Sequence, residues 1–90
     1  MPAYLIQRIM PAVGKLTPAQ FKAASASSCQ VLNELGPRIQ WVHSYVTDGQ
    51  INCVYRAPSE ALLREHARLT GLPIDHVQEI ARIIDPVTAE

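Results

Sequence analysis

The sequence lacks the motifs that many small enzymes and metalloproteins use. It has no H-E-x-x-H, no C-x-x-C pair, no phosphate-binding glycine loop and no nucleophile elbow. Those patterns place zinc ligands, phosphate-binding amides or a catalytic serine at fixed spacings. The sequence therefore gives no support for a metal hydrolase, a nucleotide enzyme or a serine hydrolase.

An excess of charge is also missing, because eight Lys and Arg residues balance eight Asp and Glu residues. A balanced surface predicts neither nucleic acid nor an anionic membrane as a partner. No apolar run is long enough to span a membrane, and the first residues lack the basic start and long apolar middle of a signal peptide. We therefore expect a soluble, cytoplasmic protein.

Cysteine is scarce, with only Cys29 and Cys53, which lie far apart in the sequence. In a reducing compartment the two should be free thiols, and buried neutral side chains are the simplest expectation for both. Ninety residues with a hydrophobic fraction of 48% predict one domain, spanning 1–90, with one modest core.

The most informative stretch is residues 39–57, where two runs rich in β-branched and aromatic residues flank Asp48-Gly49. This dipeptide suits a two-residue type I′ turn with positive φ at both central positions, so we predict a β-hairpin. A two-residue loop pairs Thr47 with Gln50, Ser44 with Cys53 and His43 with Val54. Paired residues share a face of the hairpin.

The predicted register sorts the hairpin into two faces. The first is small and largely apolar and suits a covering helix. The second mixes aromatic and polar residues and suits a partner, a ligand or a half-wet surface. The first face carries Val42, Ser44, Val46, Ile51, Cys53 and Tyr55, and the second carries Trp41, His43, Tyr45, Asn52, Val54 and Arg56.

The rest of the chain supplies two helices and two more strands. Residues 2–10 predict a central strand because both of its faces are mostly apolar. Thr17, Pro18 and Gln20 predict a capping box at the start of a helix that ends at Gly36-Pro37. Ser59 is the expected N-cap of a helix over residues 60–70, and residues 77–85 predict the last strand.

The predicted order is β-α-β-β-α-β, an α+β, ferredoxin-like sandwich with two helices on one face of a four-stranded antiparallel sheet. The other face is left open. Trp41, Tyr45 and Val54 would lie on it, and exposed apolar patches of this kind mark interaction surfaces. We expect a homodimer formed through the open sheet face, with two-fold symmetry.

His66 is the strongest candidate for chemistry, because it falls on or beside the buried face of its helix and points toward Ser44, Cys53 and Tyr55. An imidazole and a thiolate together suit Ni²⁺ or another divalent transition metal. The alternative is a structural histidine whose ring nitrogens are satisfied by the backbone or a hydroxyl.

Glu65 and His43 complete the set of candidate metal ligands. Glu65 points about 100° away from His66 on an ideal helix, so it would join His66 only near a helix end or across a dimer. His43 lies on the opposite face of the hairpin from His66, and it would reach a mate only across a two-fold interface. A polar role for His43 in that interface is the alternative.

Several segments also resemble a family of small bacterial ferredoxin-like proteins, a domain of unknown function often labelled nickel-binding. The resemblance spans nearly the whole chain and implies the same fold. It also implies nickel as a possible ligand, with Cys53 and His66 inside the matching segments, and no organic cofactor. The segments are Trp41–Thr47, Asn52–Pro58, Arg64–Ala67, Gly71–Pro73 and Asp85–Glu90.

Three functions therefore stand side by side. The first is a dimeric metal-binding protein for storage, buffering or sensing. The second is a cofactor-free dimeric α+β barrel enzyme, an isomerase or monooxygenase-like protein, with a pocket between helices and sheet where His66 or Tyr55 transfers a proton. The third is a structural or regulatory module that uses only the open face.

Overall fold

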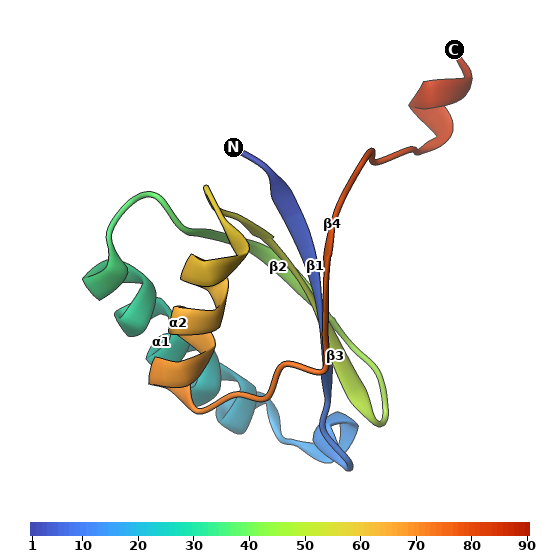
Figure 1. Ribbon diagram of the computed structural model, residues 1–90. Coiled ribbons are helices and arrows are strands. Elements are labelled where there is room, and N and C mark those ends of the chain that lie inside the picture. The colour runs from blue at the N-terminus through green and yellow to red at the C-terminus, as the bar shows by residue number, and fades with distance from the viewer.

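The computed structural model describes residues 1–90 and contains a four-stranded antiparallel sheet with both α-helices on one side (Figure 1). The strand order is β2-β3-β1-β4, so β1 is central, as predicted. The βαββαβ arrangement is confirmed. In chain order the elements are β1 (Ala3–Ile9), the 3-10 helix η1 (Val13–Lys15), α1 (Pro18–Leu35), β2 (Gln40–Val46), β3 (Gln50–Arg56), α2 (Glu60–Thr70), β4 (His76–Glu79) and the 3-10 helix η2 (Pro86–Ala89).

The predicted hairpin register is confirmed from the loop to His43. Ser44 pairs with Cys53 and His43 with Val54, and the Thr47 amide donates to the Gln50 carbonyl over 2.9 Å. The alternation of β2 and β3 side chains near the loop is therefore the one that the two-residue loop dictates.

The loop itself is not the predicted type I′ turn, because neither Asp48 nor Gly49 has a positive φ. Backbone hydrogen bonds from the segment that follows β1 stabilise the loop between β2 and β3 instead. Met10 N–H donates to the Gly49 carbonyl over 3.0 Å, and Gly14 N–H donates to the Asp48 carbonyl over 3.3 Å. A Cβ at Gly14 would lie only 2.8 Å from the Asp48 Cα, so this approach requires glycine. Tertiary contacts override the local turn preference here.

A β-bulge in β2 changes the outer half of the hairpin. His43 pairs with Val54 but Trp41 pairs with Tyr55, which leaves Val42 as the extra residue. Trp41 therefore lies on the helix-covered face with Tyr55. The prediction that Trp41 lies on the open face is wrong for this reason.

The helix boundaries follow local capping chemistry. Thr17 Oγ1 accepts from Gln20 N–H, and the Gln20 side chain accepts from Thr17 N–H, which confirms the capping box of α1. Gly36 ends this helix with a φ of 93°. Ser59 precedes α2 in an extended conformation as predicted, although its side chain makes no capping hydrogen bond.

The core lies between α2 and the two central strands. Helix α2 buries Leu63, His66 and Ala67, whereas the longer α1 buries only Ser28. Cys53 is buried as expected, but Cys29 is exposed; both are free thiols. The buried apolar cluster comprises Tyr4, Ile6, Ile39, Cys53, Tyr55, Ala57 and Leu63.

The last strand is shorter than the predicted 77–85. Tyr4 pairs with Glu79, and the last contact is the Ile80 amide donating to the Ala3 carbonyl over 2.8 Å. Since β1 begins at Ala3, no strand remains for later residues to pair with. The chain leaves the sheet there and projects from the body, with Ile83 and Ile84 exposed by 67% and 71% (Figure 1).

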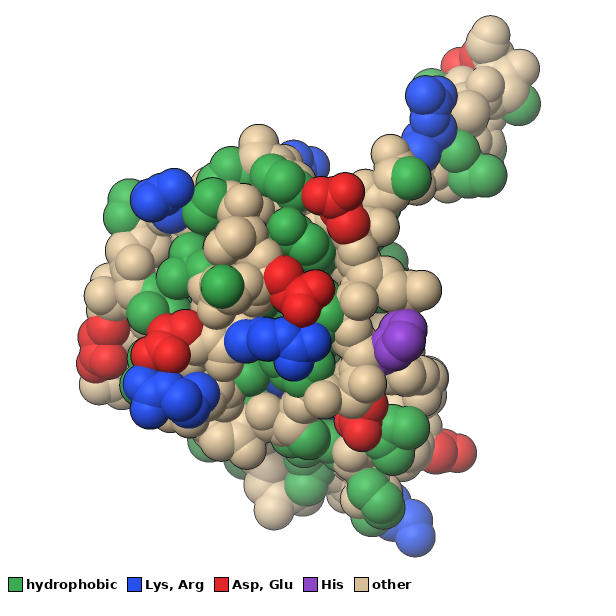
Figure 2. All heavy atoms as spheres, in the orientation of Figure 1, with side chains coloured by type: hydrophobic (Ala, Val, Ile, Leu, Met, Phe, Trp, Pro, Cys, Tyr) green, Lys and Arg blue, Asp and Glu red, His purple; other side chains and the backbone are tan.

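The surface carries both signs of charge. Figure 2 shows acidic and basic side chains interspersed over the face in view, without an area of one sign. Two of the pairs are in contact, Arg64 with Glu60 and Arg68 with Glu65, both on α2. Neither α-helix has the length and apolar composition needed to cross a membrane.

Candidate functional site

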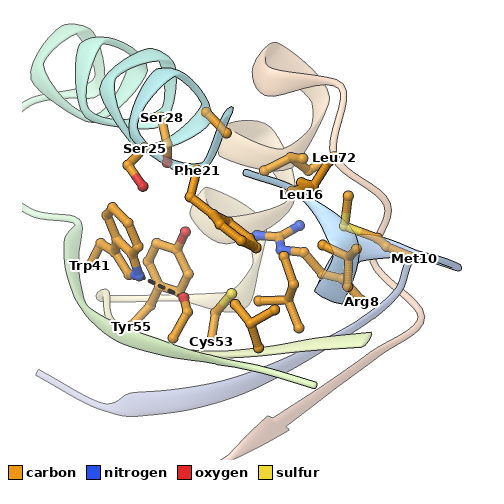
Figure 3. A pocket seen from close by; sticks show the side chains of 15 residues that line it. Arg8, Met10, Leu16, Phe21, Ser25, Ser28, Trp41, Cys53, Tyr55 and Leu72 are labelled. Carbon is orange, nitrogen blue, oxygen red and sulfur yellow. Dashed lines mark hydrogen bonds between the residues drawn. The ribbon is translucent and has the colours of Figure 1, made fainter. Parts of the chain in front are cut away.

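A cavity of about 120 Å³ lies between α1 and the sheet (Figure 3). Of its 15 lining residues 11 are hydrophobic, so its wall is mainly apolar. β2 and β3 contribute one wall, α1 contributes the opposite wall, and the end of β1 closes one side. Ser44 and Tyr55, the two predicted pocket residues, both lie on this wall.

The cavity exists because the middle of α1 has small side chains. Ala24, Ser25 and Ser28 face the sheet at positions where larger residues would fill the space. The serine hydroxyls point from α1 toward Trp41 and Tyr55 across the cavity (Figure 3). Small residues therefore leave room for a ligand here instead of bringing the helix down onto the sheet.

Trp41 has a fixed position on the sheet side of this cavity. Its indole Nε1–H donates a hydrogen bond to Ser44 Oγ over 2.9 Å (Figure 3). The bulge at Val42 makes this contact possible, because it turns Trp41 to the same face as Ser44. The indole is only partly buried and is free to contact a molecule in the cavity.

Arg8 is the one charged residue that lines the cavity, and it is only 1% exposed. Its Nη1 donates to the Pro73 carbonyl over 2.9 Å. Its Nε and Nη2 are buried without a hydrogen-bond partner. No carboxylate forms an ion pair with Arg8. The two ion pairs of the structure both lie on the surface of α2. The site thus contains an uncompensated buried positive charge.

Tyr55 lies beside Arg8 and keeps its proton. Burial raises the pKa of the Tyr55 phenol above its ordinary value of 10.0, and the neighbouring Cys53 adds to this effect. The Arg8 guanidinium and Ser28 lower that pKa, but the net shift is upward. A neutral phenol is a hydrogen-bond donor and cannot neutralise Arg8.

His66 is completely buried behind the cavity wall and does not line it. Its Nε2 is 3.2 Å from Ser28 Oγ, its ring centroid is 5.5 Å from that of Tyr55, and its Nδ1 has no partner. Burial lowers the pKa of His66 below its ordinary value of 6.5, and the nearby Arg8 charge lowers it further. The imidazole is therefore neutral near pH 7.

This shift predicts a pH-dependent stability. Because the pKa of His66 is lower in the folded state than the 6.5 of the unfolded chain, the unfolded state takes up the proton first. The free energy of unfolding should fall as the pH drops below about 6.5. Urea titrations between about pH 7.5 and 5.5 measure this, above the range in which most carboxylates titrate. His66→Gln should lose most of the dependence and the exposed His76→Gln should keep it; equal slopes for the two variants would contradict the prediction.

The structure does not gather the predicted metal ligands into one site. Cys53 and His66 lie on the helix-covered side of the sheet, and His43 lies on the opposite side. Glu65 pairs with Arg68 on the surface of α2, and this hydrogen bond lowers the pKa of its carboxyl. No group of three His, Cys, Asp or Glu side chains is close enough to hold a metal ion.

The helix-covered side does not fit a metal cation. Cys53 and His66 are the buried thiol and the buried imidazole there, and the His66 Nε2 already contacts Ser28. The buried Arg8 charge disfavours a second cation close to it, and the same charge contributes to the lowered pKa of His66. This part of the protein is better suited to an anion.

The open side of the sheet carries two imidazoles. His43 on β2 packs edge-on against Tyr45, with ring centroids 5.0 Å apart. His76 on β4 pairs with Gln7 and lies on the same side of the sheet as His43. Both histidines are exposed, Tyr45 is 61% exposed, and Val54 is half-buried beside them. No helix covers this side (Figure 1).

Sequence reasoning missed Arg8 and His76 and placed Trp41 on the wrong side of the sheet. The alternation of residues 2–10 already places Arg8 on one face with Tyr4 and Ile6, both of which are buried. A charged residue that alternates in step with buried residues along a strand indicates a buried charge, and this pattern could have identified Arg8. His76 is the first residue of β4, one position before the predicted strand, and no sequence pattern marks either that boundary or the bulge that moves Trp41.

The comparisons with known proteins agree with this fold. The family described as "Nickel responsive protein SCO4226-like" matches residues 4–80. The chain is also similar to the crystal structure of SCO4226 from Streptomyces coelicolor A3(2), with a TM-score of 0.76 and 15% identity over 91% of this chain and 99% of that one. No curated protein matches the sequence. Because the family match covers most of its length, the chain belongs to the SCO4226-like family of nickel-responsive proteins.

Proposed function

We propose that this protein responds to nickel as a homodimer that binds Ni²⁺ between the open faces of two sheets. The observation that carries the proposal is the uncovered sheet face with its two exposed imidazoles, His43 and His76. Imidazole is a ligand that suits nickel, and the family name supports that metal. The role of such binding would be storage, buffering or sensing.

A second copy is needed because one chain does not supply enough ligands at one place. His43 and His76 lie on opposite edge strands, so three strand spacings of about 4.8 Å alone separate them by roughly 14 Å across the sheet, and they are also two residues out of line along the strands. One chain also brings no three ligands together. Two-fold pairing doubles the donors at an interface and covers the apolar side chains of Tyr45, Val54 and Leu5.

Symmetry allows two arrangements of the paired sheets. A two-fold axis parallel to the strands places β2 over β4 of the other copy, so that His43 faces the strand carrying His76 and two equal sites form. An axis perpendicular to the strands places β2 over β2, so that the two His43 side chains meet at one site. The ratio of nickel to protein distinguishes these arrangements.

Calorimetric titration of the metal-stripped protein with Ni²⁺ tests the proposal, with the mass followed by light scattering. We expect nickel uptake by a particle of twice the chain mass, and loss of that uptake in His43→Ala. His76→Ala should abolish uptake only when the axis is parallel to the strands. Zn²⁺ in the same titration measures the preference for nickel.

His66→Ala and Cys53→Ser are the matched controls from the covered side of the sheet, and both should bind nickel like the unmodified protein. Uptake lost in those variants and kept in His43→Ala would move the site to the covered side. Absence of uptake in every form would reject the proposal.

A further inference from the structure

The strongest unexplained feature of the molecule is the Arg8 guanidinium. It is buried, it lines the cavity, and two of its three nitrogens have no partner. Burying a charge without a counter-charge is strongly unfavourable, and buried charges in proteins are normally paired. The acidic side chains that form ion pairs, Glu60 and Glu65, are both on the outer surface of α2. No Asp or Glu side chain is in ion-pair contact with Arg8, so we look for its counter-charge in a bound molecule.

The space beside this charge is apolar and small. Its volume of about 120 Å³ approaches that of the cavities of roughly 150 Å³ that take up benzene. Phe21 and Trp41 provide aromatic contacts on the two walls, and Met10 and Leu16 lie toward the end of β1 (Figure 3). A molecule that fills this space has an apolar body of about one ring or a short branched chain.

We propose that the cavity binds a small carboxylate with an apolar body, and that its carboxylate group is held by the Arg8 guanidinium. The two unpartnered nitrogens match the two-oxygen geometry of a carboxylate. The Tyr55 phenol and the hydroxyls of Ser25 and Ser28 are further donors on the wall. This site is separate from the open face, so the proposal does not depend on nickel binding.

The same features disfavour other anions. Phosphate carries more charge than one guanidinium neutralises, and it has no apolar part to contact Phe21 and Trp41. A neutral apolar molecule of the same shape would fill the space but leave the buried charge of Arg8 uncompensated. A monocarboxylate satisfies both the charge and the apolar wall.

The single tryptophan of the chain is Trp41, so its fluorescence reports on the cavity directly. We would titrate the protein with isovalerate and benzoate, with their neutral amides isovaleramide and benzamide, and with inorganic phosphate. We expect both carboxylates to change the fluorescence at millimolar or lower concentrations. The amides should bind about tenfold to a hundredfold more weakly, the usual effect of losing charged hydrogen bonds.

Three variants locate the site. Arg8→Met removes the charge and should reduce carboxylate binding to the level of the amides. Ser25→Leu fills the cavity without changing charge and should abolish binding of both carboxylates and both amides, whereas phosphate should leave the fluorescence unchanged in every form. Arg56→Met, an exposed arginine on the same sheet, should bind like the unmodified protein. His43→Ala should also retain carboxylate binding.

Equal binding of acids and amides to the unmodified protein would overturn the proposal even if Arg8→Met does not fold. Undiminished carboxylate binding by Arg8→Met would overturn it as well. So would the absence of any response to both carboxylates at millimolar concentration.

Discussion

Replacing Arg8 with methionine is expected to raise the free energy of unfolding of the ligand-free protein, by about 1–4 kcal/mol. The guanidinium is 1% exposed and has no counter-charge, so its removal eliminates a large desolvation penalty. Methionine has a similar length and can fill the same space with apolar contacts. The hydrogen bond of 2.9 Å that is lost goes to the carbonyl of Pro73, an exposed residue that water can reach, and the contact of Arg8 with the Tyr55 phenol is lost with it.

Urea denaturation at neutral pH measures this effect, with Arg56→Met as the control. Arg56 is exposed, so its replacement should change the free energy of unfolding by no more than about 0.5 kcal/mol. A clear loss of stability in Arg8→Met would mean that the protein itself compensates the Arg8 charge. A gain in stability together with lost carboxylate binding would identify Arg8 as a residue retained for binding at the expense of stability.

Truncating Leu63 to alanine is expected to lower the free energy of unfolding by about 2–5 kcal/mol. Leu63 is completely buried and joins α2 to the central strands through the apolar cluster of Ile6 and Tyr55. Its removal would leave a new cavity where α2 packs on the sheet. A loss of this size is a large fraction of the stability of a small domain.

Leu69→Ala is the matched control, because Leu69 is on the same helix but 43% exposed. The midpoint of urea denaturation should move much further for Leu63→Ala than for Leu69→Ala, with similar slopes of the transitions. Equal shifts would mean that α2 does not anchor the fold. Ni²⁺ binding offers a second readout, because the open face should survive in any variant that remains folded.

The fold was predictable from the sequence because several local signals agreed with one another. The two-residue loop set the pairing of Ser44 with Cys53, and Thr17 and Gly36 marked the ends of the first helix. Each of these features depends on residues close together in the chain. Features that depend on neighbouring residues can therefore be predicted from the sequence alone.

The features that could not be predicted depend on contacts between distant segments. The turn at Gly49 follows from Met10 and Gly14, and the length of β4 follows from where β1 begins. The cavity was expected between helices and sheet, but Arg8 on its wall and His66 behind it were not. A sequence pattern shows which residues share a face, but not how closely that face is packed.

The cavity thus lies where the sequence predicted a pocket, but it contains a buried positive charge that the sequence analysis did not predict. The sequence suggested a cation bound near Cys53 and His66, whereas the structure has a buried cation, Arg8, in that region. The two exposed histidines on the other side are then the better candidates for nickel. On these two proposals, the sheet would bind an anion on its helix-covered side and a metal ion on its open side.

The bulge at Val42 has a consequence for how this protein can vary over evolution. One extra residue sets the phase of β2, so that Trp41 contacts the cavity while His43, two positions later, lies on the opposite side. Substitutions along β2 alter one surface at a time. If Val42 instead of Trp41 paired with Tyr55, the bulge would be lost and Trp41 would turn to the open side, so relatives that keep both surfaces at this strand length should keep the bulge between the positions of Trp41 and His43.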